Sequence, residues 1–485
     1  QDIYLTGNPQ ITFFKVVYRR HTNFSMESIK QTFSGTADFG NDVTATISRN
    51  GDLVYRMYLE HDASFTCTSG GADKNVGLVE RYGDSLIKEC EIEIGGQRID
   101  KHTSMWNRVY SDLTEFNPSG HFGARIGPGA TAPADNGTLY QLMTGNGYGL
   151  NCEAHDGTNN MFGATSESTV NGFLYGNEAG SGDAGKITVN KIFLPLNFWF
   201  NRNPGLALPL IALQYHEVKV KMTFETLGNL ARYSETTHFV NANPAGSSDV
   251  TAAGNFDLWC DYIYLDTDER RRFAQVSHEY LIEQLQYSSD SLNTGSPSID
   301  INFNHPVKAL IWCMRNTTLV DENGGRNQTP NDGGGDASAG PVSLDSMGGN
   351  WKLKLNGHDR FKERDTRYFT RTQVWEHYTG YGSVPTIGVD VNNLDPDGIQ
   401  TYSEDAIAVY SFALKPEEHQ PSGTCNFSRI DNAQLSGDTI VVQTQGTSTA
   451  IPGTTNAATT DLTIFAVNYN VLRIMSGMGG LAYSN

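Results

Sequence analysis

Apolar and polar residues alternate in many short stretches of the chain, which is the pattern of β-strands with one buried face. A clear example is ECEIEIGGQRI at 89–99, where Cys90, Ile92 and Ile94 share one face and three glutamates share the other. Gly95-Gly96 follows, a pair that can adopt the positive φ angles of a two-residue turn. The stretch predicts a β-hairpin.

A second hairpin with the same pattern is predicted much later in the chain, at WKLKLNGHDRF, 351–361. Trp351, Leu353 and Leu355 alternate with two lysines, and Asn356-Gly357 is a preferred dipeptide for the turn. We interpret the two hairpins as copies of one unit. A tandem duplication predicts further pairs at similar separations.

Three such pairs are found. They are NFSMESIKQ from Asn23 with EYLIEQLQY from Glu279, VKVKMTF from Val218 with CNFSRID from Cys425, and YIYLD from Tyr262 with NYNVL from Asn468. The later pairs are closer together than the earlier ones. The first copy therefore needs an insertion that the second copy lacks.

The composition indicates where this insertion lies. Of the 70 residues from 117 to 186, 15 are glycine, and Asn, Ser and Thr supply much of the rest. A segment of this kind cannot form a core, so we expect a long surface excursion between strands. The second copy has a smaller loop of similar composition at 321–350.

Between the copies, LDTDERRRFAQ predicts a short helix. Asp266 can cap its start, Glu269 stands three positions later, and the basic residues 270–272 lie toward its far end, where they match the helix dipole. The basic run could alternatively bind phosphate, but we favour a connector helix.

The fold class predicted by these elements is all-β, with two tandem sandwiches or jelly rolls instead of a parallel α/β sheet. The expected domains are an N-terminal arm at 1–22, a first unit at 23–266, the connector helix at 267–277 and a second unit at 278–485. The first unit carries the surface insertion near 117–186.

Composition and charge exclude two classes of function. Asp and Glu number 54 against 35 Lys and Arg, and the net charge of −19 repels polyphosphate, so direct contact with nucleic acid is not expected. The longest uncharged apolar runs, 192–200 and 206–213, are about half of the roughly 20 residues that a membrane-spanning helix needs. We expect that the chain does not span a bilayer.

The cysteines predict neither a zinc site nor a dense set of disulfides. No two of them form a C-x-x-C pair, and their spacing favours a reducing compartment; they are Cys67, Cys90, Cys152, Cys260, Cys313 and Cys425. The sequence begins at Gln1 without an initiator Met and without a signal-peptide core. A short leader or arm is therefore expected to precede it.

Catalytic motifs are incomplete. His216-Glu217 and His278-Glu279 lack the second histidine of a zinc motif, and GSGDAGK at 180–186 has Ile187 where a Ser or Thr should reach magnesium. Asp359 and Glu363 are as readily surface charges. We therefore assign no catalytic, cofactor-binding or metal-binding residue and expect no cofactor and no enzyme activity.

Five Asn-x-Ser/Thr triplets occur, a number close to chance for this composition, and Asn136 and Asn327 are the best candidates among them because they lie in predicted loops. The triplets begin at Asn23, Asn136, Asn316, Asn327 and Asn426.

Several stretches resemble the major capsid proteins of nucleocytoplasmic large DNA viruses, the giant icosahedral viruses. They are YLTGNPQITFFKVVYRRHTNF (4–24), LPLIALQYHEVKV (208–220), FNHPVKALIW (303–312), LNGHDRF (355–361) and YSFALKPEEHQPSGTCNFSRIDN (410–432). In the last stretch, the turn Pro421-Ser422-Gly423 is expected to bring Cys425 and Phe427 to the inner face of the next strand.

The resemblance implies two consecutive eight-stranded antiparallel jelly rolls with short helices and long surface loops. It also implies a structural role in the virion capsid, in which a homotrimer forms a pseudo-hexagonal capsomer that tiles the icosahedral shell. Implied partners are further copies of the chain, minor capsid proteins and, near the N-terminal arm, the internal viral membrane. Assembly is implied in the host cytoplasm, at the viral factory.

A cationic cluster in the N-terminal region has two interpretations. If the family placement holds, Lys15, Arg19, Arg20 and His21 lie at the inner base of the capsomer, where they could contact acidic partners or lipid head groups. Alternatively, Arg19 and Arg20 form ion pairs within or between subunits at the bottom of the sandwich, and we favour this interpretation slightly.

Two other functions fit the same pattern. A glycan-binding or glycan-cleaving β-sandwich also has long Gly- and Asn-rich loops, and it would bind sugars as a monomer. A minor capsid or receptor-binding protein of similar fold is the other alternative.

Overall fold

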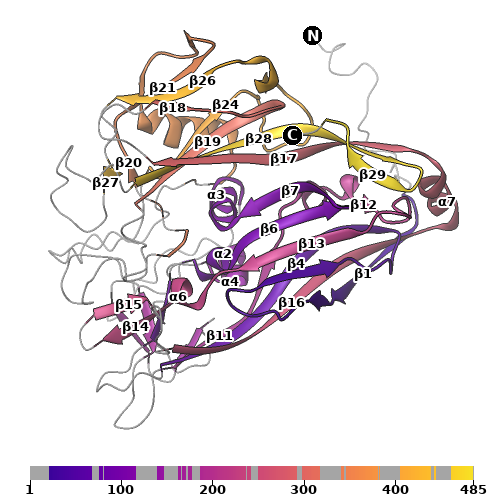
Figure 1. Ribbon diagram of the computed structural model, residues 1–485, viewed down its shortest axis with the longest axis horizontal. Coiled ribbons are helices and arrows are strands. Elements are labelled where there is room, and N and C mark those ends of the chain that lie inside the picture. The colour runs from indigo at the N-terminus through magenta and orange to yellow at the C-terminus, as the bar shows by residue number, and fades with distance from the viewer. Residues whose placement is uncertain are drawn as a thin grey trace, which may run out of the picture.

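The structure is a computed structural model of the 485-residue chain. It describes residues 21–67, 76–79, 81–115, 139–146, 162–164, 167–170, 173–176, 186–235, 238–241, 250–291, 298–316, 340–342, 344, 346–380, 382, 405–438, 442–443 and 460–483. Strands dominate these residues, and they form two sandwiches that lie side by side (Figure 1).

The first sandwich consists of two facing sheets and a smaller third sheet. The first sheet has the order β1 (Phe24–Gln31), β16 (Val250–Leu265), β4 (Leu53–Cys67), β11 (Lys186–Pro195) and β8 (Phe162–Ala164), with β12 (Leu208–Pro209) also on β4. The facing sheet has the order β2 (Phe33–Ser34), β3 (Asp42–Thr46), β13 (Val218–Phe224), β6 (Ile87–Ile94) and β7 (Gln97–Thr103). The third has the order β15 (His238–Asn241), β14 (Ala231–Glu235), β5 (Val76–Leu78), β10 (Phe173–Gly176) and β9 (Glu167–Val170).

The second sandwich repeats this plan. One sheet has the order β17 (His278–Ser291), β28 (Thr460–Met475), β19 (Pro306–Asn316) and β24 (Ile407–Ser411), with β25 (Cys425–Asn426) on β19 and β29 (Met478–Leu481) on β28. The facing sheet has the order β18 (Ser298–Asp300), β26 (Ala433–Asp438), β21 (Asn350–Leu355) and β22 (His358–Asp359), with β23 (Arg364–Asp365) on β21. A two-stranded sheet joins β20 (Ser346–Met347) to β27 (Val442–Gln443).

The strand orders of the two sandwiches correspond one to one. The order β1-β16-β4-β11 matches β17-β28-β19-β24, and β3-β13-β6-β7 matches β18-β26-β21-β22. The central pairs are antiparallel in both. Each half therefore has the eight strands of a jelly roll, and the predicted double jelly roll is confirmed.

Both predicted hairpins are confirmed. Ile94 pairs with Gln97 across Gly95 and Gly96, whose φ angles are 59° and 86°. Leu355 pairs with His358 across Asn356 and Gly357, whose φ angles are 50° and 79°. Positive φ at both central positions is what a type I′ turn requires, and it matches the twist of the flanking strands.

One of the three predicted repeat pairs is wrong. Val218 pairs with Ile94, the residue before the first hairpin turn, and Ala433 pairs with Leu355, the residue before the second. The counterpart of β13 is therefore β26, which begins at Ala433, and not the stretch from Cys425. The other two pairs are right, since β1 corresponds to β17 and β16 to β28.

Each sandwich encloses its own core. Leu59 and Leu258 from one sheet of the first sandwich pack with Ile92 and Val220 from the facing sheet, and all four are fully buried. The second core is more aromatic: the ring centroids of Trp312 and Trp351, which come from opposite sheets, are 5.7 Å apart. Phe427 is buried in this core as predicted, whereas Cys425 is only half-buried.

Short helices connect the strands. They are α2 (Tyr82–Leu86), α3 (Ser104–Thr114), α4 (Leu139–Thr144), α5 (Trp199–Arg202), α6 (Leu227–Leu230), α7 (Thr267–Gln275) and α8 (Gln373–His377), with 3-10 turns at Pro204–Leu206 and Phe427–Arg429 and a π-turn at Tyr368–Thr372. In the described part of the chain, none of the helices has the length and hydropathy needed to cross a membrane.

Helix α7 lies between the last strand of the first sandwich and the first strand of the second (Figure 1). The Asp266 carboxylate accepts a hydrogen bond from the backbone N–H of Thr267 at 2.7 Å, which caps the helix as expected. Arg270, from the basic run, donates to Asp52 at 2.8 Å. Since Asp52 is buried beside the end of β16, this ion pair fixes the helix to the first sandwich.

The prediction that 117–186 forms only a surface excursion is wrong for its described parts. Thr144 and Asn146, at the end of α4, are buried, and the side-chain oxygen of Asn146 accepts from the backbone N–H of Asp84 at 2.8 Å. Strand β8 also extends the first sheet beside β11. The glycine count predicts a loop on average but cannot show that single polar residues bind buried backbone groups. The rest of the segment lies outside the described residues.

His61 on β4 is fully buried and gives the fold a dependence on pH. Its Nδ1 lies 2.8 Å from the carbonyl oxygen of Asn255, and its Nε2 lies 2.8 Å from the hydroxyl of Tyr82. Nδ1 can therefore donate while Nε2 accepts, which a neutral ring satisfies. Burial lowers the pKa of His61 from 6.5 to about 4.

We expect the buried, neutral His61 to contribute to the free energy of unfolding above pH 6.5. This contribution should be lost as the pH falls toward 4. The unfolded chain binds the proton first, so between pH 7.5 and 5.0 the loss is about 2 kcal/mol. Urea denaturation at pH 7.5 and at pH 5.0 measures this loss of free energy of unfolding. His61→Gln has no titrating side chain at this position, so its free energy of unfolding should change by about 2 kcal/mol less between the two pH values. An equal change in both proteins would contradict the assignment.

Candidate functional site

The incomplete catalytic motifs make structural contacts where the structure describes them. Nδ1 of His216 lies 2.9 Å from the carbonyl oxygen of Gly479, and Nε2 of His278 lies 2.8 Å from that of Phe273. Asp359 pairs with Lys352 at 2.7 Å. Within the described ranges, no group of three His, Cys, Asp or Glu side chains could hold a metal ion. The stretch 180–185 lies outside these ranges.

Several other candidates also lie outside the described residues, namely Lys15, Arg19, Arg20, Asn136, Cys152 and Asn327. Of the cationic cluster, only His21 is described, and it is exposed. Asn23 is exposed just before β1, whereas the side chain of Asn426 accepts from the backbone N–H of Ser428 at 3.1 Å and caps a 3-10 turn. The thiols of Cys90, Cys260, Cys313 and Cys425 are free.

The most elaborate set of side chains lies in the seam, by which we mean the contact between the two sandwiches. Helix α3 follows β7 of the first sandwich and lies against the second (Figure 1). Thr103 caps it by accepting from the backbone N–H of Trp106 at 3.3 Å. Trp106, Val109 and Leu113 then fall on one face of the helix, as their spacing dictates, and all three are buried.

This apolar face of α3 packs into the sheet of the second sandwich. The indole of Trp106 lies against the ring of Phe465 on β28, with centroids 5.3 Å apart. Ile311 on β19 and Val409 on β24 complete the same buried cluster. A helix of the first half thus covers a sheet of the second half, which makes the seam part of the hydrophobic core.

Hydrogen bonds from backbone N–H groups join the two halves around this cluster. The backbone N–H of Leu285 donates to the Asp100 carboxylate at 3.1 Å, and the backbone N–H of Gly380 donates to the carbonyl of Leu113 at 2.8 Å. At the far end of the seam, the backbone N–H of Tyr215 donates to the carbonyl of Gly477 at 2.9 Å. Hydrogen bonds therefore join the two sandwiches at several places along the seam.

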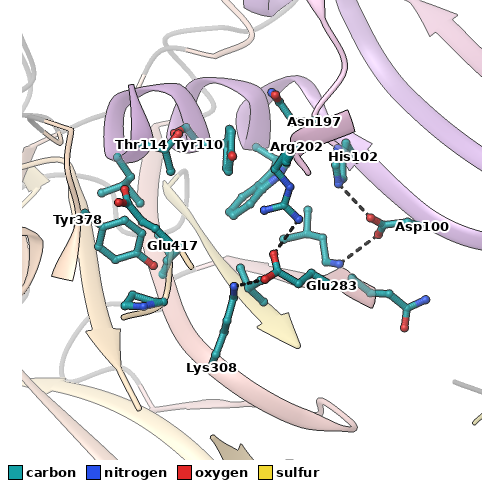
Figure 2. A pocket seen from close by; sticks show the side chains of 17 residues that line it. Asp100, His102, Tyr110, Thr114, Asn197, Arg202, Glu283, Lys308, Tyr378 and Glu417 are labelled. Atoms are coloured by element: carbon teal, nitrogen blue, oxygen red, sulfur yellow. Dashed lines mark hydrogen bonds and ion pairs between the residues drawn. The ribbon is translucent and has the colours of Figure 1, made fainter. Parts of the chain in front are cut away.

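A buried ion cluster crosses the seam (Figure 2). Glu283 on β17 accepts from Arg202 on α5 at 2.8 Å and from Lys308 on β19 at 2.5 Å. Arg202 belongs to the first sandwich, and the other two belong to the second. Burial alone would raise the pKa of Glu283, but Arg202, His419 and Lys308 together lower it to about 2. The carboxylate is therefore ionised between two cations.

A cavity of about 230 Å³ lies beside the ion cluster, and residues of both sandwiches form its wall (Figure 2). The lining residues are Asp100, His102, Trp106, Tyr110, Leu113, Thr114, Asn197 and Arg202 from the first half, and Glu283, Gln284, Leu285, Lys308, Ile311, Tyr378, Pro416, Glu417 and Val467 from the second.

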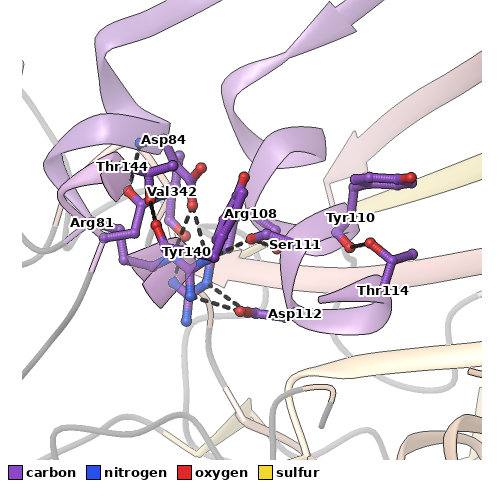
Figure 3. A network of polar contacts seen from close by, with 11 residues as sticks. Arg81, Asp84, Arg108, Tyr110, Ser111, Asp112, Thr114, Tyr140, Thr144 and Val342 are labelled. Atoms are coloured by element: carbon purple, nitrogen blue, oxygen red, sulfur yellow. Dashed lines mark hydrogen bonds and ion pairs between the residues drawn. The ribbon is translucent and has the colours of Figure 1, made fainter. Parts of the chain in front are cut away.

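A second polar network holds α3 to α2 (Figure 3). Arg81 donates to Asp84 at 2.8 Å and to Asp112 at 2.7 Å, so its guanidinium is paired with two carboxylates. Arg108, from the preceding turn of α3, donates to the carbonyl of Val342 in the second half at 2.6 Å. Bidentate and charge-assisted bonds of this kind fix orientation as well as adding stability. The network positions the helix that forms the seam.

The sequence carries a weak signal for the seam residues. Glu283 is the only charge in YLIEQL, and Lys308 is the only charge in PVKALIW. A single charge within an apolar strand is unusual unless a partner is buried with it. The partner Arg202, however, lies on the short helix α5, far away in the sequence, and nothing local identifies it.

Two family models match consecutive parts of the chain. The model of the major capsid protein N-terminus matches residues 12–266. The model of the large eukaryotic DNA virus major capsid protein matches residues 269–480. Their boundary falls at α7, between the two sandwiches.

Full-length relatives agree with these models. The major capsid protein of Pyramimonas orientalis virus is 46% identical, over 100% of this chain and 97% of the relative. That of Paramecium bursaria Chlorella virus 1 is 39% identical, over the same shares.

Solved structures are similar along the whole chain. A chain of the quasi-atomic PBCV-1 virus capsid has a TM-score of 0.65 and 36% identity, covering 98% of this chain and 100% of that one. The Faustovirus major capsid protein has a TM-score of 0.60, with coverage of 98% and 94%, and at 13% identity it supports the fold alone.

Proposed function

The chain belongs to the family of large eukaryotic DNA virus major capsid proteins, and from this premise we propose that three copies form a capsomer with six jelly rolls. Its role is structural, in the virion capsid. The observation that carries the proposal is the pair of sandwiches with one strand order in a single chain. Three copies place six similar units around one axis, which approximates a hexagon that can tile an icosahedral shell.

The seam supports this function because it joins the two jelly rolls into one block. Apolar packing by Trp106, the ion cluster around Glu283 and backbone bonds all cross it. A capsomer can present six regular edges to its neighbours only if the two rolls of each subunit keep one relative position. The full-length match favours this function over a glycan-binding sandwich and over a minor capsid or receptor-binding protein.

Exposed apolar side chains offer surface for contacts between copies. Trp375 on α8 is 82% exposed and Leu414 is 77% exposed. The two residues belong to neighbouring segments, since Nδ1 of His377 lies 3.2 Å from the carbonyl oxygen of Leu414. Large apolar groups of this kind are enriched at protein interfaces, so we expect them to be buried in the assembled shell.

We also propose that the chain divides into an arm at 1–22, a first jelly roll at 23–266, a connector at 267–277 and a second jelly roll at 278–485. Minor capsid proteins lie beneath the capsomer, and the internal membrane lies near the arm. Arg19 and Arg20 either contact these partners or form ion pairs at the base. Assembly takes place in the host cytoplasm, without enzyme activity and without direct contact with the genome.

The mass of the purified protein in solution tests the capsomer. Size-exclusion chromatography with light scattering should give about 160 kDa, three times the 53.2 kDa of one chain. A stable monomer of 53.2 kDa that binds sugars would instead support the glycan-binding alternative.

A further inference from the structure

Unpaired polar groups gather at two ends of the seam cavity (Figure 2). At one end, the Nε–H of Arg202 is buried and has no acceptor among the described residues. The side-chain amide of Asn197, at the same end, also makes no hydrogen bond to them. The carboxylates at this end are already engaged: Glu283 by Arg202 and Lys308, and Asp100 by the backbone N–H of Leu285. This end therefore still has N–H groups to donate and is suited to an acceptor.

The other end of the cavity has an oxygen that can accept a hydrogen bond. Oε1 of Glu417 accepts from the backbone N–H and the hydroxyl of Thr379, both at 3.0 Å, which leaves its second oxygen without a partner in the described part of the chain. The ring of Tyr378 lies near Glu417 in the same part of the wall (Figure 2), and its hydroxyl makes no hydrogen bond to a described residue. Both residues are half-buried. A ligand hydroxyl could donate to Glu417 and accept from Tyr378.

A further part of the cavity wall is apolar. Trp106, Leu113 and Leu285 line it together with Ile311 and Val467. A dry cavity of about 150 Å³ accepts benzene. The volume here, about 230 Å³, therefore has room for one aromatic ring with a short substituent at each end.

We propose that this cavity is a binding site for a small aromatic acid that carries a hydroxyl group opposite its carboxylate. The carboxylate accepts from Arg202 and Asn197, the ring lies among the apolar side chains beside Trp106, and the hydroxyl meets Glu417 and Tyr378. Nothing covalent takes place. Because both jelly rolls contribute to the wall, a bound ligand stabilises the seam and raises the unfolding temperature.

Calorimetric titration of the full-length protein with 4-hydroxyphenylacetate tests the proposal. We expect saturable binding of one molecule per chain with a Kd of about 1 mM or lower, as for well-placed ligands of this size. Tyrosol has the same ring and phenol but no carboxylate, and it should bind about tenfold more weakly. Absence of saturable binding of 4-hydroxyphenylacetate, or equal affinity for the two probes, would overturn the proposal.

Two variants locate the binding site. Arg202→Lys keeps the charge beside Glu283 but lacks the Nε donor, so the preference for 4-hydroxyphenylacetate over tyrosol should fall to about threefold or less. Thr114→Phe adds a ring at the Glu417 end and should abolish binding of both probes. Asn107→Phe is the matched control, since it adds the same ring to α3 away from the cavity lining and should leave binding intact. Unchanged binding in both Arg202→Lys and Thr114→Phe would place the ligand elsewhere and refute the proposal.

Discussion

Replacing Glu283 with glutamine is expected to lower the free energy of unfolding by about 3–5 kcal/mol, because it leaves two buried cations without their shared carboxylate. Arg202 and Lys308 each donate to a different oxygen of Glu283. A neutral amide cannot compensate two positive charges, and its nitrogen would face a donor. The loss should appear in urea denaturation of the full-length protein at neutral pH.

Glu279→Gln is a matched control on the same strand. Glu279 pairs with Arg473 at 2.8 Å, but more than half of each side chain is exposed. Solvent screens such a pair, so its loss should change the free energy of unfolding by less than about 1 kcal/mol. If both variants lost the same small amount, the ion cluster would not contribute to the seam in the way that its burial indicates.

The same cluster predicts behaviour in acid. The pKa of Glu283 is lowered to about 2, below the 4.5 of an ordinary glutamate. The unfolded chain therefore binds the proton at a higher pH than the folded one does. The stabilisation by this carboxylate is fully present above about pH 4.5 and is lost as the pH falls toward 2. Glu283→Gln should accordingly be less sensitive to pH in this range than the unmodified protein.

Truncating Trp106 to alanine is the second change with a large expected effect. Its indole comes from the first jelly roll, is 5% exposed, and packs against Phe465 of the second. Removal of a buried Trp costs about 3–5 kcal/mol, since the transfer energy of the ring is lost and a cavity remains. Differential scanning calorimetry of the full-length protein should show the loss as a lower unfolding temperature.

Asn107→Ala, at the neighbouring position of α3, separates the packing effect from a general effect on the helix. Asn107 is half-exposed, and alanine favours a helix, so its unfolding temperature should change little. A Trp106→Ala protein as stable as the Asn107→Ala protein would mean that α3 does not hold the two jelly rolls together.

Local pattern was enough to predict two tandem β-sandwiches or jelly rolls because the repeated unit carries strong local signals, whereas the eight-stranded double jelly roll followed from the family resemblance. Alternation in 89–94 and 351–355 identifies the inward faces, and the Gly-Gly and Asn-Gly turns fix the register of both hairpins. A repeat pair that contains no turn dipeptide has no fixed register, and its alignment from sequence similarity can be wrong. The proposed match of Val218 with Cys425 relied on similarity alone, and the strand that actually corresponds begins at Ala433.

The seam could not be predicted from the sequence because its partners are distant along the chain. Arg202 and Glu283 are joined only after both sandwiches have formed, as are Trp106 and Phe465. Hydrophobic periodicity predicts which face of a segment is buried, but it does not identify the segment that packs against that face. The buried Asn146 shows the same limit, since its bond to the backbone of Asp84 has no counterpart in the composition of the loop around it.

The proposed particle contains three chains with two jelly rolls in each. Negative-stain electron microscopy of the purified full-length protein tests this most directly. Class averages should show three-fold particles with a hexagonal outline and six lobes of similar size. Averages of single two-lobed particles at every concentration at which the protein stays folded would contradict it.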